Sequence, residues 1–184
     1  RVAIDWLNAE HRLITRVLAS MGTLLSSLEP ADEEARAVLG HYVEFFRRYV
    51  EGRHEKIEES VIFSELTEHA GIAEPVALLG EEHRQRAGRL AALADLAAGE
   101  GPLGPEEAER LTEAAAAYTS ALRAHIAKED HSLFPLAGSY LSEERMQRVA
   151  SQLTEQTAAD DYADLIAMAE LLVSHGAALE AKDE

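Results

Sequence analysis

The sequence predicts an all-α protein, an up-down-up-down bundle of four helices followed by one or two extra C-terminal helices. Apolar residues recur at alternating steps of three and four along four long segments, which is the spacing of one face of an α-helix. Proline and glycine gather at the borders of these segments, where they begin or end helices. No segment shows a convincing two-residue alternation of a strand. Short connections between four long helices favour the up-down-up-down order.

The first two helices are predicted from apolar faces that a histidine interrupts. The first face consists of Ile4, Leu7, His11, Ile14, Leu18, Met21 and Leu25. The second consists of Val43, Phe46, Val50, His54, Ile57, Glu58 and Val61. We expect the break between them at residues 29–32, where a proline and the capping Asp32 stand. The second helix fades near Gly71.

The third and fourth helices follow the same pattern. The third begins near Glu74 with Pro75 in its first turn, and its predicted inner face is Val76, Leu79, His83, Ala87, Leu90, Ala94 and Ala97. Residues 99–105, rich in glycine and proline, form the plainest loop. The predicted inner face of the fourth helix is Tyr118, Ala121, Leu122, His125, Glu129, Leu133 and Leu136. We expect Pro135 and Gly138 to close it.

The last part of the chain predicts a helical appendage. From about Leu141 the periodicity is weaker, with Ser142 as a candidate cap. A later apolar stripe holds Leu165, Met168, Leu171 and Leu172. We therefore divide the chain into a bundle of residues 1–140 and an appendage of residues 141–184, which packs on the bundle or mediates a homodimer.

Composition excludes several functional classes. The chain has no cysteine, which excludes thiolate metal sites, iron–sulfur clusters and disulfides. Its formal net charge of −17 argues against nucleic acid and anionic lipid as partners. No run of 18 apolar residues stands in the chain, so we expect no membrane helix and a cytoplasmic protein. Because the chain begins with Arg1 rather than methionine, we expect residues to have been removed ahead of it.

Six residues on the predicted inner faces indicate a metal site. Each helix carries one histidine where a leucine would pack better: His11, His54, His83 and His125. Glu58 and Glu129 follow two of these histidines by four residues, an advance of ~400° that keeps each pair on one helix face. A buried carboxylate is costly unless it is paired or bound to metal. Imidazole with carboxylate is a common ligand set for iron, zinc or manganese.

An internal repeat strengthens this interpretation. His11 and His54 are 43 residues apart, and His83 and His125 are 42 apart. The segment Glu10-His11-Arg12 matches Glu82-His83-Arg84, and residues 54–63 align with residues 125–134. Two similar hairpins would bring four histidines and two glutamates to the bundle axis. That set is enough for two metal ions, with the glutamates bridging them.

The motifs resemble those of the hemerythrin-like, HHE cation-binding family. They are EHRLI at residues 10–14, RHEKIEESVIF at 53–63 and HIAKEDHSLFPLA at 125–137, within a resemblance that covers roughly residues 3–140. The resemblance implies a hemerythrin-like bundle with two iron ions and an oxo or hydroxo group between them. It implies that His11 and His54 hold one iron, that His83 and His125 hold the other, and that Glu58 and Glu129 bridge both.

Two departures from the family's oxygen carriers bear on function. Those carriers have a second histidine one turn after the first in the third helix, where this chain has Ala87. Their fourth-helix carboxylate is an aspartate five residues after its histidine, whereas Glu129 follows His125 by four. We therefore expect a protein that binds and reacts with oxygen or peroxide, and leave open whether it turns peroxide over or oxidises ferrous iron as an enzyme. The alternatives are a protein that binds or senses oxygen, nitric oxide or iron without turnover, and an iron-centre repair protein.

The sequence also allows two other kinds of bundle and offers further residues near these six. A ferritin-like site needs Glu-x-x-His on two helices, and only residues 51–54 fit. A structural bundle with an empty or zinc-filled site is a further alternative. Tyr118 either lines the metal pocket or belongs to the core, while Arg86, Glu55 and Glu59 are expected in solvent. The remaining histidines are expected to have no role in the site: His41, His69, His131 and His175.

Overall fold

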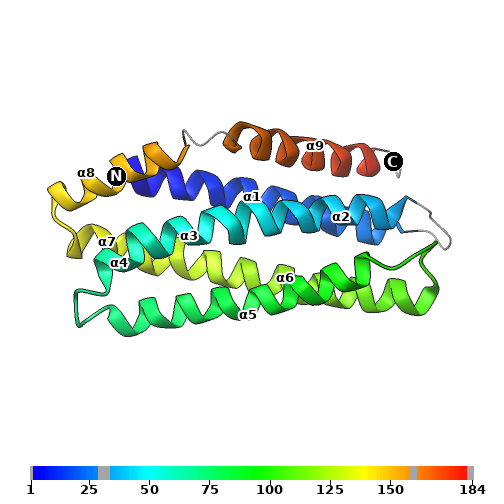
Figure 1. Cartoon of the computed structure of the whole chain (residues 1–184), viewed down its shortest axis with the longest axis horizontal. Helices are drawn as coiled ribbons and strands as arrows, with labels where there is room; N and C mark the ends of the chain where they lie inside the picture. The colour runs from blue at the N-terminus through cyan, green and yellow to red at the C-terminus, as the bar shows by residue number, and fades with distance from the viewer. Residues whose placement is uncertain (1, 29–33, 158–160, 182–184) are drawn as a thin grey trace.

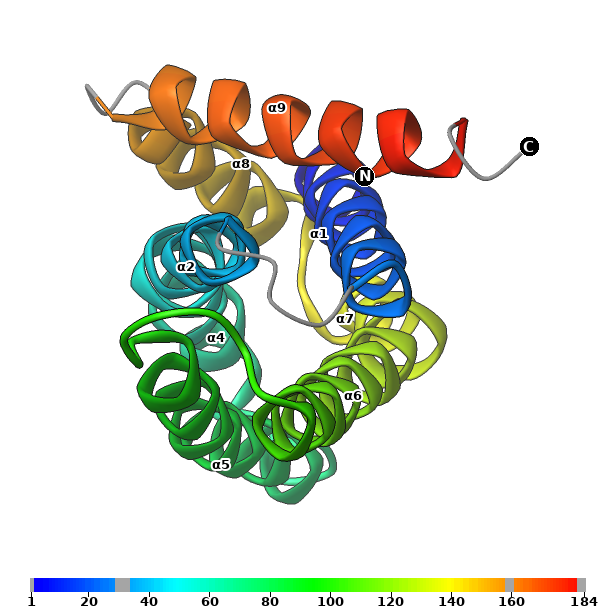
Figure 2. The same cartoon turned by 90° about the vertical axis from the view of Figure 1, so that its right-hand side faces the viewer.

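The fold is a bundle of four long helices with two shorter helices along one side (Figures 1 and 2). The computed structural model describes residues 2–28, 34–157 and 161–181, and over these residues the chain is helical without a strand. This confirms the predicted all-α bundle with additional C-terminal helices. The predicted break at residues 29–32 falls outside the described residues.

Each bundle helix is one element or an unbroken succession of several. The first is α1 (Val2–Ser26). The second consists of α2 (Ala35–Phe45), η1 (Phe46–His54), α3 (Glu55–Ile57), η2 (Glu58–Phe63) and α4 (Ser64–Leu66). The third is α5 (Ala73–Ala97). The fourth consists of α6 (Pro105–Lys128), η3 (Glu129–Leu133) and α7 (Phe134–Tyr140).

The four helices form a closed ring around the bundle axis. α1 contacts α2 and α6, and α5 contacts the same two helices from the other side. The third helix begins with Pro75 in its first turn, and the fourth begins at Pro105 after the predicted loop. Consecutive helices run in opposite directions, and their inner faces meet along the bundle axis (Figure 1).

Wide π-helical turns occur where the second and fourth helices carry their candidate ligands. His54 ends η1, Glu58 begins η2 and Glu129 begins η3. Such turns in otherwise α-helical segments are frequent at functional sites. Gly52 lies inside η1, and a Cβ atom there would lie 3.0 Å from the carbonyl oxygen of Arg47. Glycine therefore allows this wide turn to close without crowding.

The predicted end of the fourth helix at Pro135 was wrong. The helix continues through Pro135 to Tyr140, and the proline lies in the first turn of α7, directly after η3. In a regular α-helix a proline ring clashes with the carbonyl of the preceding turn. The wider turns of η3 relieve this clash, so the helix continues past the proline.

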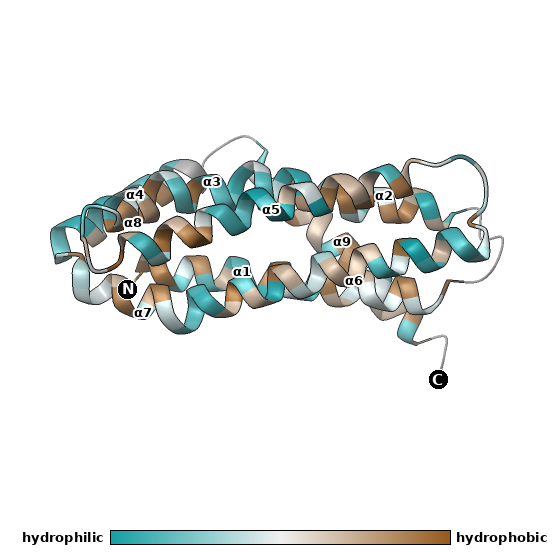
Figure 3. Cartoon of the chain, turned by 90° about the horizontal axis from the view of Figure 1, so that it is seen from below, coloured by the Kyte–Doolittle hydropathy of each residue, from teal (hydrophilic) through white to brown (hydrophobic). Residues whose placement is uncertain are grey.

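Two apolar clusters fill the bundle, one on each side of the histidine level. One extends from Ile14 through α2, α6 and α9. The other extends from Ala3 through η2, α7 and α8. The hydropathy colouring shows apolar residues towards both ends of the bundle (Figure 3). The polar candidate site therefore lies between two packed apolar regions.

The C-terminal helices α8 (Glu143–Thr157) and α9 (Tyr162–Glu180) pack on the bundle. Ser142 accepts a hydrogen bond from the backbone N–H of Arg145, as predicted for a cap. α9 lies along α1, where the hydroxyl of Ser20 donates to the carbonyl oxygen of Leu172 at 2.6 Å. A Cβ atom at Gly176 would lie 2.3 Å from the Ser20 hydroxyl oxygen. The close approach of α9 to α1 therefore requires a glycine at this position.

Within the described residues, α9 alone is long and apolar enough to pass a test for membrane-spanning helices. It has 19 residues and a mean hydropathy of 1.2. The sequence analysis predicted no membrane-spanning helix and did not identify α9 as a candidate. In the structure, one face of α9 is buried against the bundle through Leu165, Ala169 and Leu172.

Candidate metal centre

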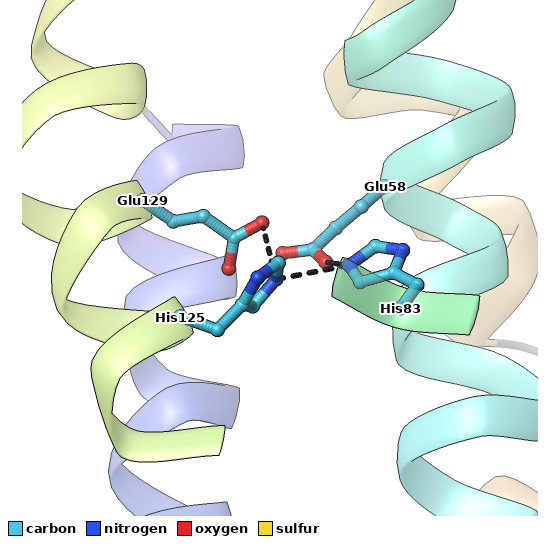
Figure 4. A group of neighbouring side chains, drawn as sticks. All are labelled: Glu58, His83, His125 and Glu129. Carbon is cyan, nitrogen blue, oxygen red and sulfur yellow. Dashed lines mark hydrogen bonds and ion pairs between the residues drawn. The ribbon is translucent and has the colours of Figure 1, made fainter. Parts of the chain in front are cut away.

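The structure brings all six predicted ligand residues together at the bundle axis. Each of the four helices contributes one histidine, and the second and fourth also contribute Glu58 and Glu129. All six side chains are buried, and the two glutamates are completely inaccessible to solvent. Figure 4 shows four of them converging from facing helices.

The four histidines form two pairs. Nε2 of His11 lies 3.0 Å from Nε2 of His54, and Nε2 of His83 lies 2.9 Å from Nε2 of His125. One pair joins the first two helices, and the other joins the last two. Two nitrogen ligands about 2.1 Å from one ion and at right angles to each other lie about 3.0 Å apart. Each pair therefore has the spacing expected of two ligands of one ion.

The two glutamates lie between the histidine pairs. Oε1 of Glu58 is 3.3 Å from Nε2 of His54, and its Oε2 is 3.7 Å from Nε2 of His83. Glu129 is arranged in the same way, with one oxygen 3.1 Å from Nε2 of His125 and the other 3.4 Å from a nitrogen of the opposite pair. A carboxylate with one oxygen towards each pair is placed to bridge two ions.

A ring of carboxylates accepts hydrogen bonds from the Nδ1 atoms of the four histidines. The four contacts, with their nitrogen–oxygen distances, are His11–Asp130 (2.6 Å), His54–Glu10 (2.8 Å), His83–Glu59 (2.7 Å) and His125–Glu82 (2.9 Å). Each helix supplies the carboxylate for the histidine of the next helix, and the fourth supplies the first. Such partners fix the orientation and tautomer of an imidazole and raise its basicity as a ligand.

These contacts determine where the lone pairs point. A carboxylate only accepts hydrogen bonds, so each Nδ1 carries a proton and each neutral imidazole has a bare lone pair on Nε2. The four oxygens of Glu58 and Glu129 are buried and have no hydrogen bond in the described part of the chain. Lone pairs and carboxylates therefore face one another without a donor between them. Such an arrangement is unfavourable unless protons or metal cations lie among them.

The metal-free centre binds protons strongly for this reason. Burial by itself lowers the pKa of a histidine. At His11, the hydrogen bond with Asp130 and the nearby carboxylates of Glu129 and Glu58 outweigh burial and raise the pKa from 6.5 to about 11. The pKa of Glu129 is lowered, although burial alone would raise it, because its carboxylate lies close to the imidazoles of His11 and His125. A cation is thus favoured at this place, and the donor set of imidazole and carboxylate fits iron, zinc or manganese.

Comparison with known proteins assigns the family. The sequence model of the Hemerythrin HHE cation binding domain matches residues 2–137. The chain belongs to the hemerythrin HHE cation-binding family. The match extends over the four bundle helices to Ala137 and contains all six residues of the centre. Family membership and the buried histidine–glutamate groups together support a metal-binding, hemerythrin-like protein.

Similar proteins come from mycobacteria. Uncharacterized proteins of Mycobacterium bovis and of two strains of Mycobacterium tuberculosis are each 24% identical to this hemerythrin-family chain over 152 residues. The aligned region covers 82% of this chain and 59% of each relative, so the chain spans about three fifths of their length. No solved structure matches the chain.

Three expectations about neighbouring residues were wrong. Arg86 and Glu55 were expected in solvent, but both are buried, and Arg86 donates a hydrogen bond to Glu55. Ala87 was placed on the inner face of the third helix, but it is exposed. The buried positions of α5 proceed from His83 by three residues to Arg86 and then by four to Leu90. The inner residue one turn after His83 is therefore an arginine.

The remaining expectations concern residues outside the six. Tyr118 is fully buried, its ring lies 5.1 Å from that of Phe46, and its hydroxyl has no hydrogen bond in the described part of the chain. Its aromatic ring therefore belongs to the core. Glu59 is exposed as expected, yet it reaches His83. His41 and His131 are exposed. The candidate metal groups among the described residues contain none of the four additional histidines.

Sequence reasoning missed the ring of carboxylates around this hemerythrin-family centre. Its members are Glu10, Glu59, Glu82 and Asp130. Each stands directly beside a candidate ligand in the chain, and each has a counterpart at the same place in the internal repeat. Repetition of these acidic neighbours was the available signal.

Proposed function

We propose that this chain holds two iron ions between its histidine pairs and reacts with oxygen species, hydrogen peroxide first among them. One observation carries the proposal. The Nε2 atoms of His11 and His54 lie 3.0 Å apart, those of His83 and His125 lie 2.9 Å apart, and carboxylate oxygens that form no hydrogen bond in the described part of the chain lie between the pairs. Two cations satisfy this cluster of acceptors better than any rearrangement of the neutral side chains does.

The residues of the centre and its surroundings would have three roles. His11 and His54 would hold one ion, and His83 and His125 the other. Glu58 would bridge the two ions, as would the fourth-helix glutamate that mirrors it in the repeat. The ring of carboxylates would orient the imidazoles, and the apolar clusters on both sides would limit access of bulk water. Iron held in this way supplies a Lewis acid and a redox-active centre.

The number of ligands favours reactivity over simple storage. Two imidazoles and one oxygen from each glutamate give each ion four protein atoms. Iron sites with few protein ligands keep positions open for exogenous molecules. The reaction we propose is the disproportionation of hydrogen peroxide, in which two H₂O₂ give two H₂O and one O₂. One peroxide is oxidised and the other reduced, so no further reductant is consumed.

The test is oxygen release from peroxide. Protein loaded with Fe(II) under anaerobic conditions is mixed with excess hydrogen peroxide, and dissolved oxygen is recorded with an electrode. Sustained release of one O₂ for every two peroxide molecules, many times per chain, is the expected result, with protein loaded with Zn(II) as the control. Reversible binding of oxygen or nitric oxide with peroxide left unchanged would instead support the binding or sensing alternative.

A further inference from the structure

A second group of buried polar residues lies beside the metal centre, on the side towards residues 98–104. It comprises Glu51, Glu55, Arg86 and Tyr118, and we call it the polar layer. Arg86 from the third helix donates a hydrogen bond to Glu55 of the second helix. Both are buried, Tyr118 is fully inaccessible, and Glu51 is half-buried. The charges of Glu55, Arg86 and Glu51 all act on the hydroxyl of Tyr118, so the four groups share one neighbourhood.

The polar layer contains several buried atoms that form no hydrogen bond. Within the described part of the chain these are Nε and Nη1 of Arg86, the hydroxyl of Tyr118 and Oε1 of Glu51. Together they offer N–H and O–H donors close to a carboxylate acceptor. An unsatisfied buried donor or acceptor is unfavourable, and buried polar groups are normally satisfied by protein, water or a ligand. The layer is thus equipped to hold small hydrogen-bonding molecules.

The internal repeat shows that the fold does not need polar residues here. Glu51 stands three residues before His54, and its counterpart three before His125 is Leu122. The counterparts of the other two charged residues, at matching distances from their own histidines, are Ile126 for Glu55 and Ile14 for Arg86. These three counterparts are buried and belong to one apolar cluster. The first and fourth helices therefore carry apolar residues at the places where the second and third helices carry three charged residues.

A surface pocket reaches the polar layer from outside. It has a volume of ≈ 200 Å³ and lies between α5 and α6. Its wall includes Arg86, the exposed Arg89 and Lys128, with the small side chains of Ala121 and Ala124. A water molecule needs only about 10–15 Å³ of such space. Because Arg86 lines the pocket and also belongs to the polar layer, the pocket leads from the surface to the polar layer.

We propose that the polar layer is a binding subsite and inlet through which hydrogen peroxide reaches the metal centre. Peroxide is small and neutral and both donates and accepts hydrogen bonds, which matches the free donors of Arg86 and Tyr118 and the free acceptor of Glu51. Two carboxylates beside one guanidinium disfavour anions. Dioxygen and nitric oxide make only weak hydrogen bonds and gain little from the layer. This inference rests on the proposed function and assigns its substrate class.

The test replaces the three charged residues of the polar layer by the apolar residues that stand at the equivalent positions of the repeat. The triple variant Glu51→Leu, Glu55→Ile, Arg86→Ile is compared with wild type and with Arg84→Ile, which removes an exposed arginine of the same helix that does not line the pocket. We expect unchanged iron content, and equal or higher thermal stability because apolar replacements of a buried ion pair are often neutral or stabilising. The rate constant for reaction with peroxide should fall about tenfold, the loss expected from a hydrogen bond to a charged group. The rate of nitric oxide binding should not change.

The outcomes separate this inference from the proposed function. A triple variant that reacts with peroxide as fast as wild type would overturn the inlet while leaving the reactive centre in place. Wild type that binds iron and leaves peroxide untouched would overturn both. Tyr118→Phe provides a second test with minimal change in packing, and its peroxide rate should also fall. A high-resolution crystal structure should show ordered water on the free atoms of Arg86 and Tyr118, and bare atoms there would contradict a subsite.

Discussion

Glu82 accepts a hydrogen bond from Nδ1 of His125 at 2.9 Å, although its neighbour in the sequence is His83. The same carboxylate also binds Lys128 at the surface. The contact therefore joins the third helix to the fourth and connects a buried imidazole with an exposed ion pair. Its counterpart in the repeat, Glu10 with His54, is buried instead and accepts a hydrogen bond from Tyr49.

Removal of this contact should weaken metal binding without unfolding the bundle. Glu82→Ala frees the imidazole of His125 to rotate and lowers its basicity, so we expect metal affinity to fall roughly 10–100-fold. Competition with a chromophoric chelator measures the affinity. Glu81→Ala is the matched control, because Glu81 is exposed on the same helix and its hydrogen bonds in the described part of the chain are with Arg84 and Gln85 of that helix. Equal affinities of the two variants would show that Glu82 does not support the centre.

The bridging glutamates should matter more than any other buried residue near the centre. Glu58→Ala or Glu129→Ala removes a carboxylate placed between both histidine pairs, so we expect fewer than two ions per chain. Tyr118→Phe is the control, since Tyr118 is equally buried but has no hydrogen bond to the six residues. Elemental analysis after desalting measures the content. Full occupancy in both glutamate variants would contradict their assignment as bridges.

Metal-free and metal-loaded protein should respond differently to alkaline pH. The pKa of His11 is raised from 6.5 to about 11 in the folded chain. Its proton therefore contributes stability that is fully present below pH 6.5 and is lost as the pH rises towards 11. Metal must displace this proton and binds better as the pH rises. We expect the difference in melting temperature between loaded and metal-free protein to widen across this range.

The control for this pH effect is His11→Gln. Other groups titrate at alkaline pH in both proteins, but the variant lacks the raised pKa. Its metal-free form should lose less stability than metal-free wild type between neutral pH and pH 11. Identical slopes in the two metal-free proteins would show that His11 is not protonated in the folded state.

Docking of α9 should be sensitive to one glycine. Gly176→Ala places a Cβ atom against Ser20 of α1, and such overpacking costs about 1–3 kcal/mol. Gly22→Ala, on an exposed face of α1 with nothing within 4 Å of the new atom, should instead stabilise by about 0.5–1 kcal/mol. Chemical denaturation of both variants measures these changes. A neutral Gly176→Ala would contradict the close contact between the two helices.

The bundle and the six converging residues were predictable because periodicity and an internal repeat encode them directly. A histidine on an apolar face packs less well than an aliphatic residue does. Four such histidines at matched spacing therefore indicate a shared function. Family membership confirmed the fold and the class of protein. The roles of the individual ligands stay predictions that metal analysis can test.

The residues around the centre were harder to predict because their roles depend on small rotations of the helices. Ala87 and Arg86 are adjacent, and steps of three and four place one outside and the other inside. Wide turns in the second helix also change which residues face inwards. The pattern of charged residues at 51–59 therefore did not predict that Glu55 is buried. An imidazole at residue 87 would lie on the exposed side of α5.

The most direct test of the central claim is the number of metal ions bound per chain. Metal-depleted protein is reconstituted with excess Fe(II) under anaerobic conditions, desalted, and analysed for iron and for protein by independent methods. Two pairs of facing Nε2 atoms with two carboxylates between them predict two iron ions per chain. One ion per chain, or none, would contradict a centre built from all six residues.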